Sequence, residues 1–255
     1  MHPPSTPPSS FARWLQRSVA VLLSATIPLL WLSVSPEIDF FFADLYYDAG
    51  TQRFPWNDRW FSAKVMHSGA RTLLIGLGLA LIVLVTYDLN WPQRWLSPLR
   101  RTQLRIVALS AVLAPLLIGL LKANSALHCP NKIERYGGAQ PFLEIFAATP
   151  EVWDAGRCFP AGHASAGMWL AALAAFWLPR APGKASVVFL GGLLIGSGLG
   201  WVQQMRGQHF LSHTLWTLWL TSALILTLLT IFAAKLERRN APNARRYGTR
   251  PSPPV

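Results

Sequence analysis

The sequence predicts an all-α protein that crosses a membrane with six helices and keeps both termini in the cytoplasm. Of its 255 residues, 52% are hydrophobic and only 13% are charged. The hydrophobic residues gather in six runs, each near the roughly 20 residues that span a bilayer core. Lys and Arg concentrate in alternate connecting segments, as in multi-span proteins. This combination excludes an ordinary soluble domain.

The six runs define one membrane domain, which we expect to cover residues 18–234. The first run follows Arg13 and Arg17 and has no small-residue cleavage site after it, so it is interpreted as an uncleaved signal anchor. Residues 1–17 are expected to form a disordered tail, and residues 235–255 a basic disordered tail on the anionic inner leaflet. The runs are 18–34, 70–87, 104–121, 161–178, 187–204 and 213–234.

The distribution of basic residues sets the predicted orientation, because cytoplasmic loops are enriched in Lys and Arg. The segments 35–69, 122–160 and 205–213 then lie on the outer side. Because the net charge of +12 falls in short clusters and not on one face of an element, nucleic acid is not expected as a partner. The cytoplasmic clusters are Arg13 and Arg17; Arg94, Arg100, Arg101 and Arg105; Arg180 and Lys184; and Lys235, Arg238, Arg239, Arg245, Arg246 and Arg250.

The outer segment 35–69 is rich in aromatic residues. One interpretation is an amphipathic segment that lies in the lipid interface and shapes a lipid entrance. The other is an aromatic belt that only anchors the protein. The sequence leaves both open.

Three outer segments concentrate polar residues close to the predicted spans. Residues 122–130 end the third span, residues 157–165 lead into the fourth, and residues 206–213 join the fifth to the sixth. Ionisable groups at membrane depth are costly, so such clusters indicate function. Isolated histidines at helix ends are more often interfacial, and His67 and His128 are interpreted in that way.

Together these segments resemble the three signature motifs of the type 2 phosphatidic acid phosphatase family. The motifs are Lys, six residues, Arg-Pro; Pro-Ser-Gly-His; and Ser-Arg, five residues, His, three residues, Asp. The resemblance covers the third to sixth spans, and the Cys-Pro and His-Phe-Leu-Ser-His sequences resemble in particular a divergent bacterial subgroup. The matching positions are Lys122, Pro130, Pro160, Gly162, His163 and His209.

Several motif positions differ from the family pattern. Cys129 stands in place of the first arginine, Ala161 in place of the serine, and His213 in place of the aspartate. The third-motif arginine falls on Gln203, whereas Arg206 lies three residues later. Residues three apart share a helix face, so Arg206 is expected to reach the same phosphate.

The resemblance implies a phosphatase that uses a histidine nucleophile and no metal or other cofactor. His209 would attack phosphorus through one ring nitrogen while His213 holds the other, and His163 would protonate the departing lipid oxygen and then activate water. Phosphoryl transfer also needs groups that neutralise the phosphate oxygens. These are expected to be the side chains and helix-start backbone of Lys122, Arg157, Arg206, Ala161 and Gly162.

Two other function classes remain open. His209 and His213, with His163 or His128, could bind zinc or iron in a membrane metalloenzyme. The displaced arginines would also suit a catalytically inactive transporter or scaffold of the same fold.

The expected partner is a phosphorylated lipid of the bilayer, at the periplasmic face of a bacterial inner membrane. Undecaprenyl pyrophosphate, phosphatidylglycerol phosphate, phosphatidic acid and a lipid A phosphate all fit. The sequence distinguishes neither among them nor between hydrolysis and transfer to a second lipid, and it does not specify the oligomeric state.

The two cysteines, Cys129 and Cys158, both lie on the predicted outer side beside motif residues. A disulfide between them would tie the first motif to the second in an oxidising compartment. Two buried free thiols are the alternative, and the sequence leaves the two interpretations open.

Overall fold

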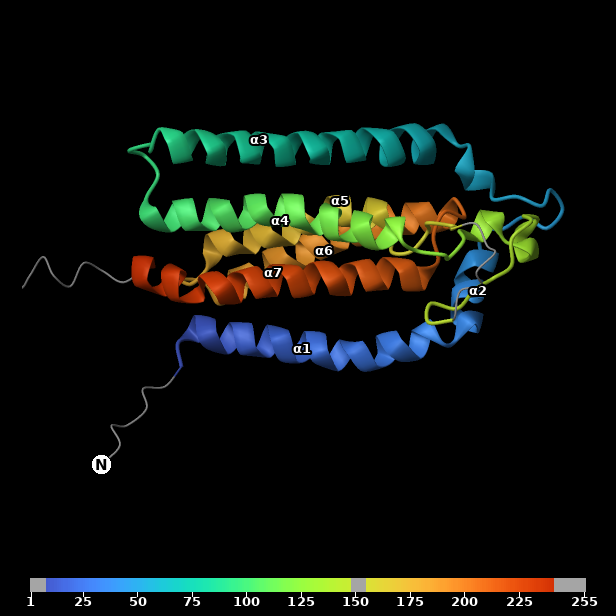
Figure 1. Ribbon diagram of the computed structural model, residues 1–255, viewed down its shortest axis with the longest axis horizontal. Coiled ribbons are helices and arrows are strands. Elements are labelled where there is room, and N and C mark those ends of the chain that lie inside the picture. The colour runs from blue at the N-terminus through green and yellow to red at the C-terminus, as the bar shows by residue number, and fades with distance from the viewer. Residues whose placement is uncertain (1–7, 148–154, 241–255) are drawn as a thin grey trace, which may run out of the picture.

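The computed structural model describes residues 8–147 and 155–240. Within these ranges the chain forms helices and isolated bridges but no strand, which confirms the all-α prediction. Figure 1 shows the long helices running side by side along the longest axis, with α2 (Pro36–Asp44) at one end. The expected tails at 1–7 and 241–255 lie outside the described residues.

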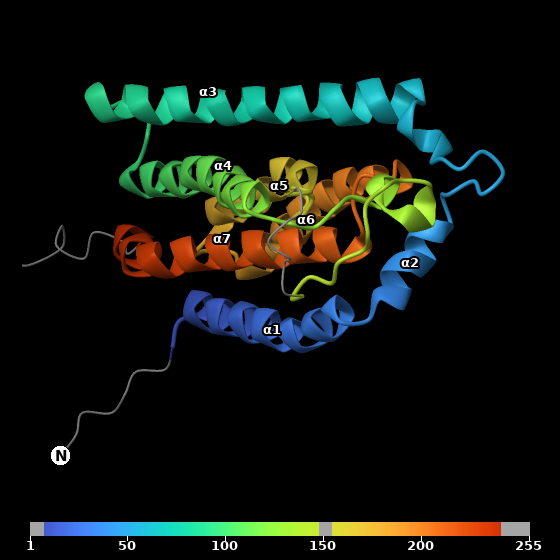
Figure 2. The same ribbon diagram turned by 45° about the vertical axis from the view of Figure 1, so that its right-hand side comes forward.

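Five helical segments are long and apolar enough to cross a membrane. They indicate a multi-pass membrane protein. The segments are α1 (Ser10–Ser33), the π-helical η2 (Phe61–Gly69) with α3 (Ala70–Asn90), α4 (Pro98–Ala123), α6 (Pro182–Met205) and α7 (Leu211–Asn240). Figure 2 shows α7 between α1 and α4, with α3 on the far side of α4.

The fourth expected span, 161–178, is built differently from the others. It consists of a short α-helix, α5 (Gly162–Met168), that tightens into a 3₁₀-helix, η5 (Trp169–Trp177). The segment packs against α4, α6 and α7 at the centre of the bundle, and most of its alanines are fully buried. Because protein surrounds it, this segment need not match the length or hydropathy of a lipid-facing helix.

Close packing of α6 on this central segment depends on glycine. A Cβ at Gly192 would overlap the backbone of Ala171, and one at Gly196 would overlap that of Met168. Gly192 and Gly196 are four residues apart and so lie on one face of α6. Small residues at this spacing let membrane helices approach closely.

Both ends of the membrane domain extend beyond the expected bounds. Helix α1 begins at Ser10, not at residue 18, because the side chain of Ser9 caps it and Phe11 is buried. Helix α7 continues to Asn240, past the expected end at residue 234, and its residue Leu236 is fully buried. The predicted disordered tails are therefore wrong for residues 10–17 and 235–240.

The outer segment 35–69 is also more ordered than a loop. It contains α2, the 3₁₀ turn η1 (Pro55–Asn57) and η2, which continues directly into α3. The second membrane helix thus begins at Phe61 instead of residue 70. The polar residues Lys64 and His67 interrupt the apolar run, and for this reason the sequence pattern placed the helix start too late.

Gly192 and its neighbour Gly191 provide a matched test of this packing. Nothing lies within 4 Å of a Cβ at Gly191. We expect Gly192→Ala to destabilise the protein by about 1–3 kcal/mol through overpacking. Gly191→Ala should be neutral or stabilising by up to about 1 kcal/mol, because alanine favours helix. Thermal unfolding of both variants in detergent measures the difference, and equal melting temperatures would contradict this packing.

Candidate functional site

The three polar motif segments meet at one end of the bundle, away from Ser10 and Asn240 (Figure 1). The first lies at the end of α4, where Lys122 occupies the last turn. The second opens α5, and the third is the link 206–210 between α6 and α7. Helix ends that are distant in the chain thus place their polar residues together.

Lys122 and the start of α5 share a cavity. Nζ of Lys122 lies 3.9 Å from the position that a Cβ would take at Gly162. Lys122, Gly162 and His163 line a cavity of about 600 Å³ that continues between α3 and α4. Nε2 of His163 is buried and has no hydrogen-bond partner among the described residues. No described residue therefore uses the hydrogen-bonding capacity of this nitrogen.

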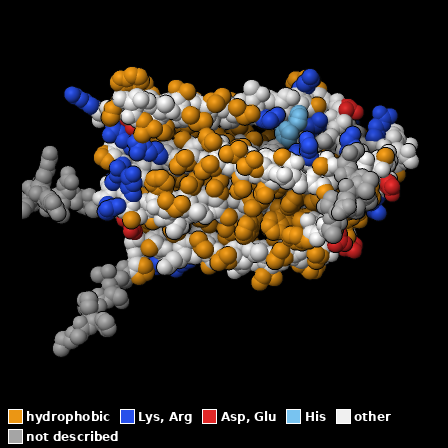
Figure 3. Space-filling view, viewed as in Figure 1, with side chains coloured by type: hydrophobic (Ala, Val, Ile, Leu, Met, Phe, Trp, Pro, Cys, Tyr) orange, Lys and Arg blue, Asp and Glu red, His pale blue; other side chains and the backbone are white. Residues whose placement is uncertain are grey.

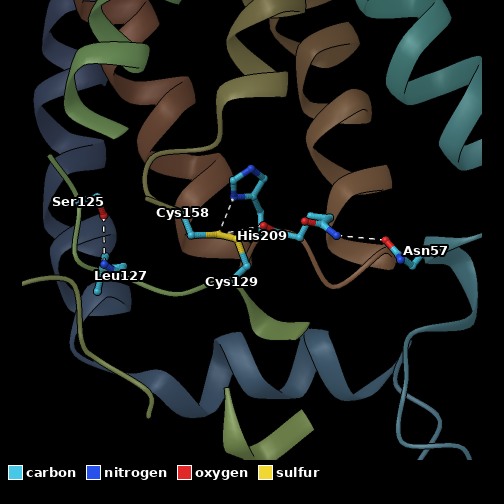
Figure 4. The surroundings of a disulfide bond; sticks show 7 residues. Asn57, Ser125, Leu127, Cys129, Cys158 and His209 are labelled. Carbon is cyan, nitrogen blue, oxygen red and sulfur yellow. Dashed lines mark hydrogen bonds between the residues drawn. A yellow bond between two sulfur atoms is a disulfide. The ribbon is translucent and has the colours of Figure 1, made fainter. Parts of the chain in front are cut away.

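His209 lies in the link 206–210 and is only 3% exposed. Its Nδ1 is 3.5 Å from Sγ of Cys158, as Figure 4 shows. Burial holds the pKa of His209 well below its ordinary value, and the positive charge of Lys122 acts in the same direction. The neutral ring keeps a lone pair, which a nucleophile requires.

His213 does not make the expected hydrogen bond to His209. The two ring centroids are 5.8 Å apart, and Nδ1 of His213 is buried without a partner among the described residues. Sulfur of Cys158 occupies the place next to His209 Nδ1. The contact that orients His209 is therefore to the cysteine, and the role predicted for His213 is not supported by this geometry.

Cys129 and Cys158 form a disulfide with Cα atoms 5.3 Å apart. It joins the segment after α4 to the segment before α5, as Figure 4 shows. The nearby backbone supports this pairing, since the Cys158 amide donates to the Leu127 carbonyl at 2.9 Å. Of the two interpretations left open by the sequence, the structure has the bridged form.

The disulfide also bears on the metal interpretation. Cys158, His209 and His213 have ligand atoms within 4.8 Å of one another. However, Sγ of Cys158 is bonded to Cys129 and is not a thiolate, the form that binds metals. Two histidines remain, fewer than a zinc site normally uses.

Arg206 follows α6 and points back along it. Its guanidinium donates to Oε1 of Gln203 at 3.0 Å and to the carbonyl of Asn57 at 3.4 Å. Burial lowers the pKa of Arg206, and the negative charge of Asp58 opposes that shift. Its positive charge acts on His163. The structure thus places Arg206 beside Gln203, the position of the family arginine.

Two groups that were expected to bind phosphate, the Arg157 side chain and the Ala161 amide, are not placed to do so. Arg157 is exposed and forms no ion pair with a described residue. Ala161 is fully buried, and its amide donates to the His213 carbonyl at 3.3 Å. Because that amide already has an acceptor, it is not free for phosphate. This geometry therefore does not support phosphate binding by the Ala161 backbone, which stays a prediction.

Three residues of the site were missed by sequence reasoning. His67 stacks on His163, and Arg71 lines the same cavity as Lys122. Asp39, on α2, is 5% exposed and accepts hydrogen bonds from the amide and hydroxyl of Ser212 at the start of α7. The sequence did contain signals for these residues. Asp39 is a charged residue beside an aromatic run, and His67 and Arg71 are polar residues one helical turn apart.

Comparison with known families gave one match. The family model described as PAP2 superfamily matches residues 103–237, which is more than half of the chain and covers α4 to α7. Searches of curated proteins and of solved structures returned no match.

We expect loss of the disulfide to lower kcat roughly 10- to 100-fold, because His209 would lose its fixed neighbour. The bond closes a loop with a sequence separation of 29 residues, and on the chain-entropy model it stabilises the fold by about 3–4 kcal/mol. Intact mass after alkylation, with and without reductant, checks the bond, and kinetics of Cys129→Ser/Cys158→Ser checks its effect. Reductant should not slow that double variant further. Alkylation of both cysteines in denatured, unreduced wild type would contradict the bridge.

Asp39 should make stability depend on pH. Burial raises its pKa from 3.8 to about 6, against the lowering effect of its bonds to Ser212. Between these values the folded protein keeps a proton that the unfolded chain has lost. The stabilisation from this proton is therefore complete below pH 3.8 and disappears as the pH rises through about 6. It amounts to roughly 3 kcal/mol.

Melting curves from pH 4 to 7 should show wild type losing stability relative to Asp39→Asn, which cannot titrate at this position. Glu37→Gln, an exposed change on the same helix, should follow wild type. Parallel curves for Asp39→Asn and wild type would disprove the assignment.

Proposed function

Since the chain belongs to the PAP2 superfamily, we propose that it removes or transfers the phosphoryl group of a membrane lipid through a phosphohistidine at His209. Family membership and the five apolar helices support a phosphatase-type function in a membrane. The finer proposal rests on the geometry of the site. It concerns the substrate, the reacting histidines and the side of the membrane.

A single cavity carries the lipid part of this proposal. At the outer end it is lined by Lys122 and His163. Deeper in the bundle it is lined by apolar residues of α3 and α4, among them Leu74, Ile75 and Val112. A phosphate needs cations, and a hydrocarbon chain needs apolar surface. One cavity of about 600 Å³ offers both, which favours a phosphorylated lipid over a water-soluble phosphate ester.

The surroundings of His209 and His163 support the following chemistry. Because Nδ1 of His209 faces Cys158, Nε2 is the nitrogen that attacks phosphorus. The N–P bond forms as the P–O bond to the lipid breaks, and protonated His163 gives its proton to the leaving oxygen. His163 then takes a proton from water, or from the hydroxyl of an acceptor lipid, as that oxygen attacks phosphorus; the N–P bond breaks, which frees His209 and releases the phosphate or the phosphorylated acceptor. Lys122 and Arg206 neutralise charge on the phosphate oxygens.

The distribution of charge supports a periplasmic site in a bacterial inner membrane. Figure 3 shows Lys and Arg clustered at the end of the bundle where α1 begins and α7 ends, and further Lys and Arg together with most of the visible Asp and Glu at the opposite end, with a hydrophobic belt between. Cytoplasmic ends of membrane helices carry this basic excess. Both termini are then cytoplasmic, and the site faces the opposite side. A disulfide beside the site also suits an oxidising compartment.

The lipid itself belongs to one of a few classes. Undecaprenyl pyrophosphate, phosphatidylglycerol phosphate, phosphatidic acid and a lipid A phosphate each combine a phosphate group with hydrocarbon chains. Phosphate release from a panel of these lipids in detergent, with and without a second lipid as acceptor, distinguishes the substrates and separates hydrolysis from transfer.

We expect wild-type protein given a ³²P-labelled lipid phosphate to retain acid-labile label, because a phosphohistidine hydrolyses in acid. His209→Ala should neither retain label nor release phosphate. His128→Ala, a matched histidine outside the proposed reaction, should do both. Labelling of His209→Ala at the wild-type level would refute the proposed nucleophile.

A further inference from the structure

Two polar residues approach the site from a helix outside the matched family region. His67 lies in η2 and Arg71 at the start of α3, and these segments form one continuous helix. Residues four apart lie on the same side of a helix. The family match begins at residue 103, so neither residue lies in the part of the chain that the family model covers. Both residues nevertheless lie beside the site, because His67 contacts His163 and Arg71 lines the same cavity as Lys122.

His67 is in direct contact with His163. The two ring centroids are 4.1 Å apart and the planes differ by 33°, so the rings stack. Nδ1 of His67 and Nε2 of His163 are both buried without a hydrogen-bond partner among the described residues. A ring stacked at this distance restricts how His163 can turn. His67 is therefore placed to hold the proposed proton donor in one orientation.

Arg71 lies on the same cavity wall as Lys122 and His163. The positive charge of Arg71 acts on Lys122, His67 and His163. Figure 3 shows histidine between Lys and Arg side chains at this end of the molecule. Neither Arg71 nor Lys122 forms an ion pair with any described residue. Both charges face a shared space that contains no protein carboxylate.

Arg71 is exposed and Lys122 is half-buried, so water weakens but does not remove the repulsion between these two positive charges, which no carboxylate of the cavity offsets. Such an arrangement is stable when an anion binds between the charges. A phosphate group carries the matching charge, and arginine binds it through two parallel hydrogen bonds. Cys129 and Gln203 stand where arginines would otherwise supply this charge. Arg71 can supply it from another helix.

We propose that Arg71 binds the phosphate together with Lys122, and that His67 is a positioning residue that holds the ring of His163. The inference deepens the proposed function and rests on it. The competing explanation is that Arg71 is an interfacial anchor and that His67 only fills space. If Arg71 is only an anchor, its removal should not change the affinity for phosphate. Binding of inorganic phosphate therefore distinguishes the two explanations.

The binding experiment uses the full-length protein in detergent and inorganic phosphate as the probe. We expect phosphate, but not chloride at equal ionic strength, to raise the melting temperature of wild type. The apparent Kd should increase about 10- to 100-fold in Arg71→Ala, the cost of a charge-assisted hydrogen bond. Arg71→Lys should recover part of this loss. Lys64→Ala removes an exposed cation from the same helix and should match wild type.

Two results would overturn the role of Arg71. One is a Kd of Arg71→Ala equal to that of Lys64→Ala. The other is a wild-type protein that phosphate does not stabilise. Because this measurement needs no turnover, it fails independently of the proposed function. The proposed function fails instead if wild type binds phosphate but releases none from any lipid in the panel.

His67 is tested by kinetics on whichever lipid is turned over, and by phosphate binding. We expect His67→Ala to lower kcat about tenfold with little change in KM or in the Kd for phosphate, because the loss lies in orientation. His67→Phe keeps a ring at this position and should recover most of the rate. Ser68→Ala is the exposed control. A His67→Phe variant as slow as His67→Ala, or an unchanged kcat in both, would rule out positioning by stacking.

Discussion

The site depends on the conformation of the five-residue link 206–210 between α6 and α7. Gly207 adopts φ +67° there, and a Cβ at this position would overlap the ring of Phe54. The Gly207 carbonyl accepts from the Asn131 amide at 2.9 Å, and the side chain of Gln208 donates to Asn57 at 3.1 Å (Figure 4). A link this short, held at several points, leaves His209 few alternative positions.

Segments outside the helical bundle contact this link and the start of α7. Helix α2 supplies Asp39 to the first turn of α7, η1 supplies Asn57 to the link, and the disulfide presses Cys158 against His209. All of these contacts lie at the end of the bundle that carries the site. These segments therefore act as a frame around His209, the proposed nucleophile.

The sequence predicted the parts of this protein that local patterns encode. Apolar runs locate the membrane helices, and fixed spacings locate Lys122, His163 and His209. It did not locate Asp39 or the stack of His67 on His163, because those contacts join residues far apart in the chain. Helix starts were also misplaced where polar residues such as Lys64 and His67 precede the apolar run, since hydropathy cannot distinguish a polar helical turn from a loop.

The departures from the family pattern can be explained together if a motif arginine has two separate tasks, to supply positive charge and to hold its loop in position. An arginine at a motif position would neutralise phosphate and, through its hydrogen bonds to that phosphate, hold the loop that carries it. Here the disulfide at Cys129 fixes the loop, so a cation is no longer needed at that position for structure. The missing positive charge is available from Arg71 across the cavity. Dividing the two tasks between a covalent bond and a distant helix would preserve the chemistry that we propose for His209 and His163.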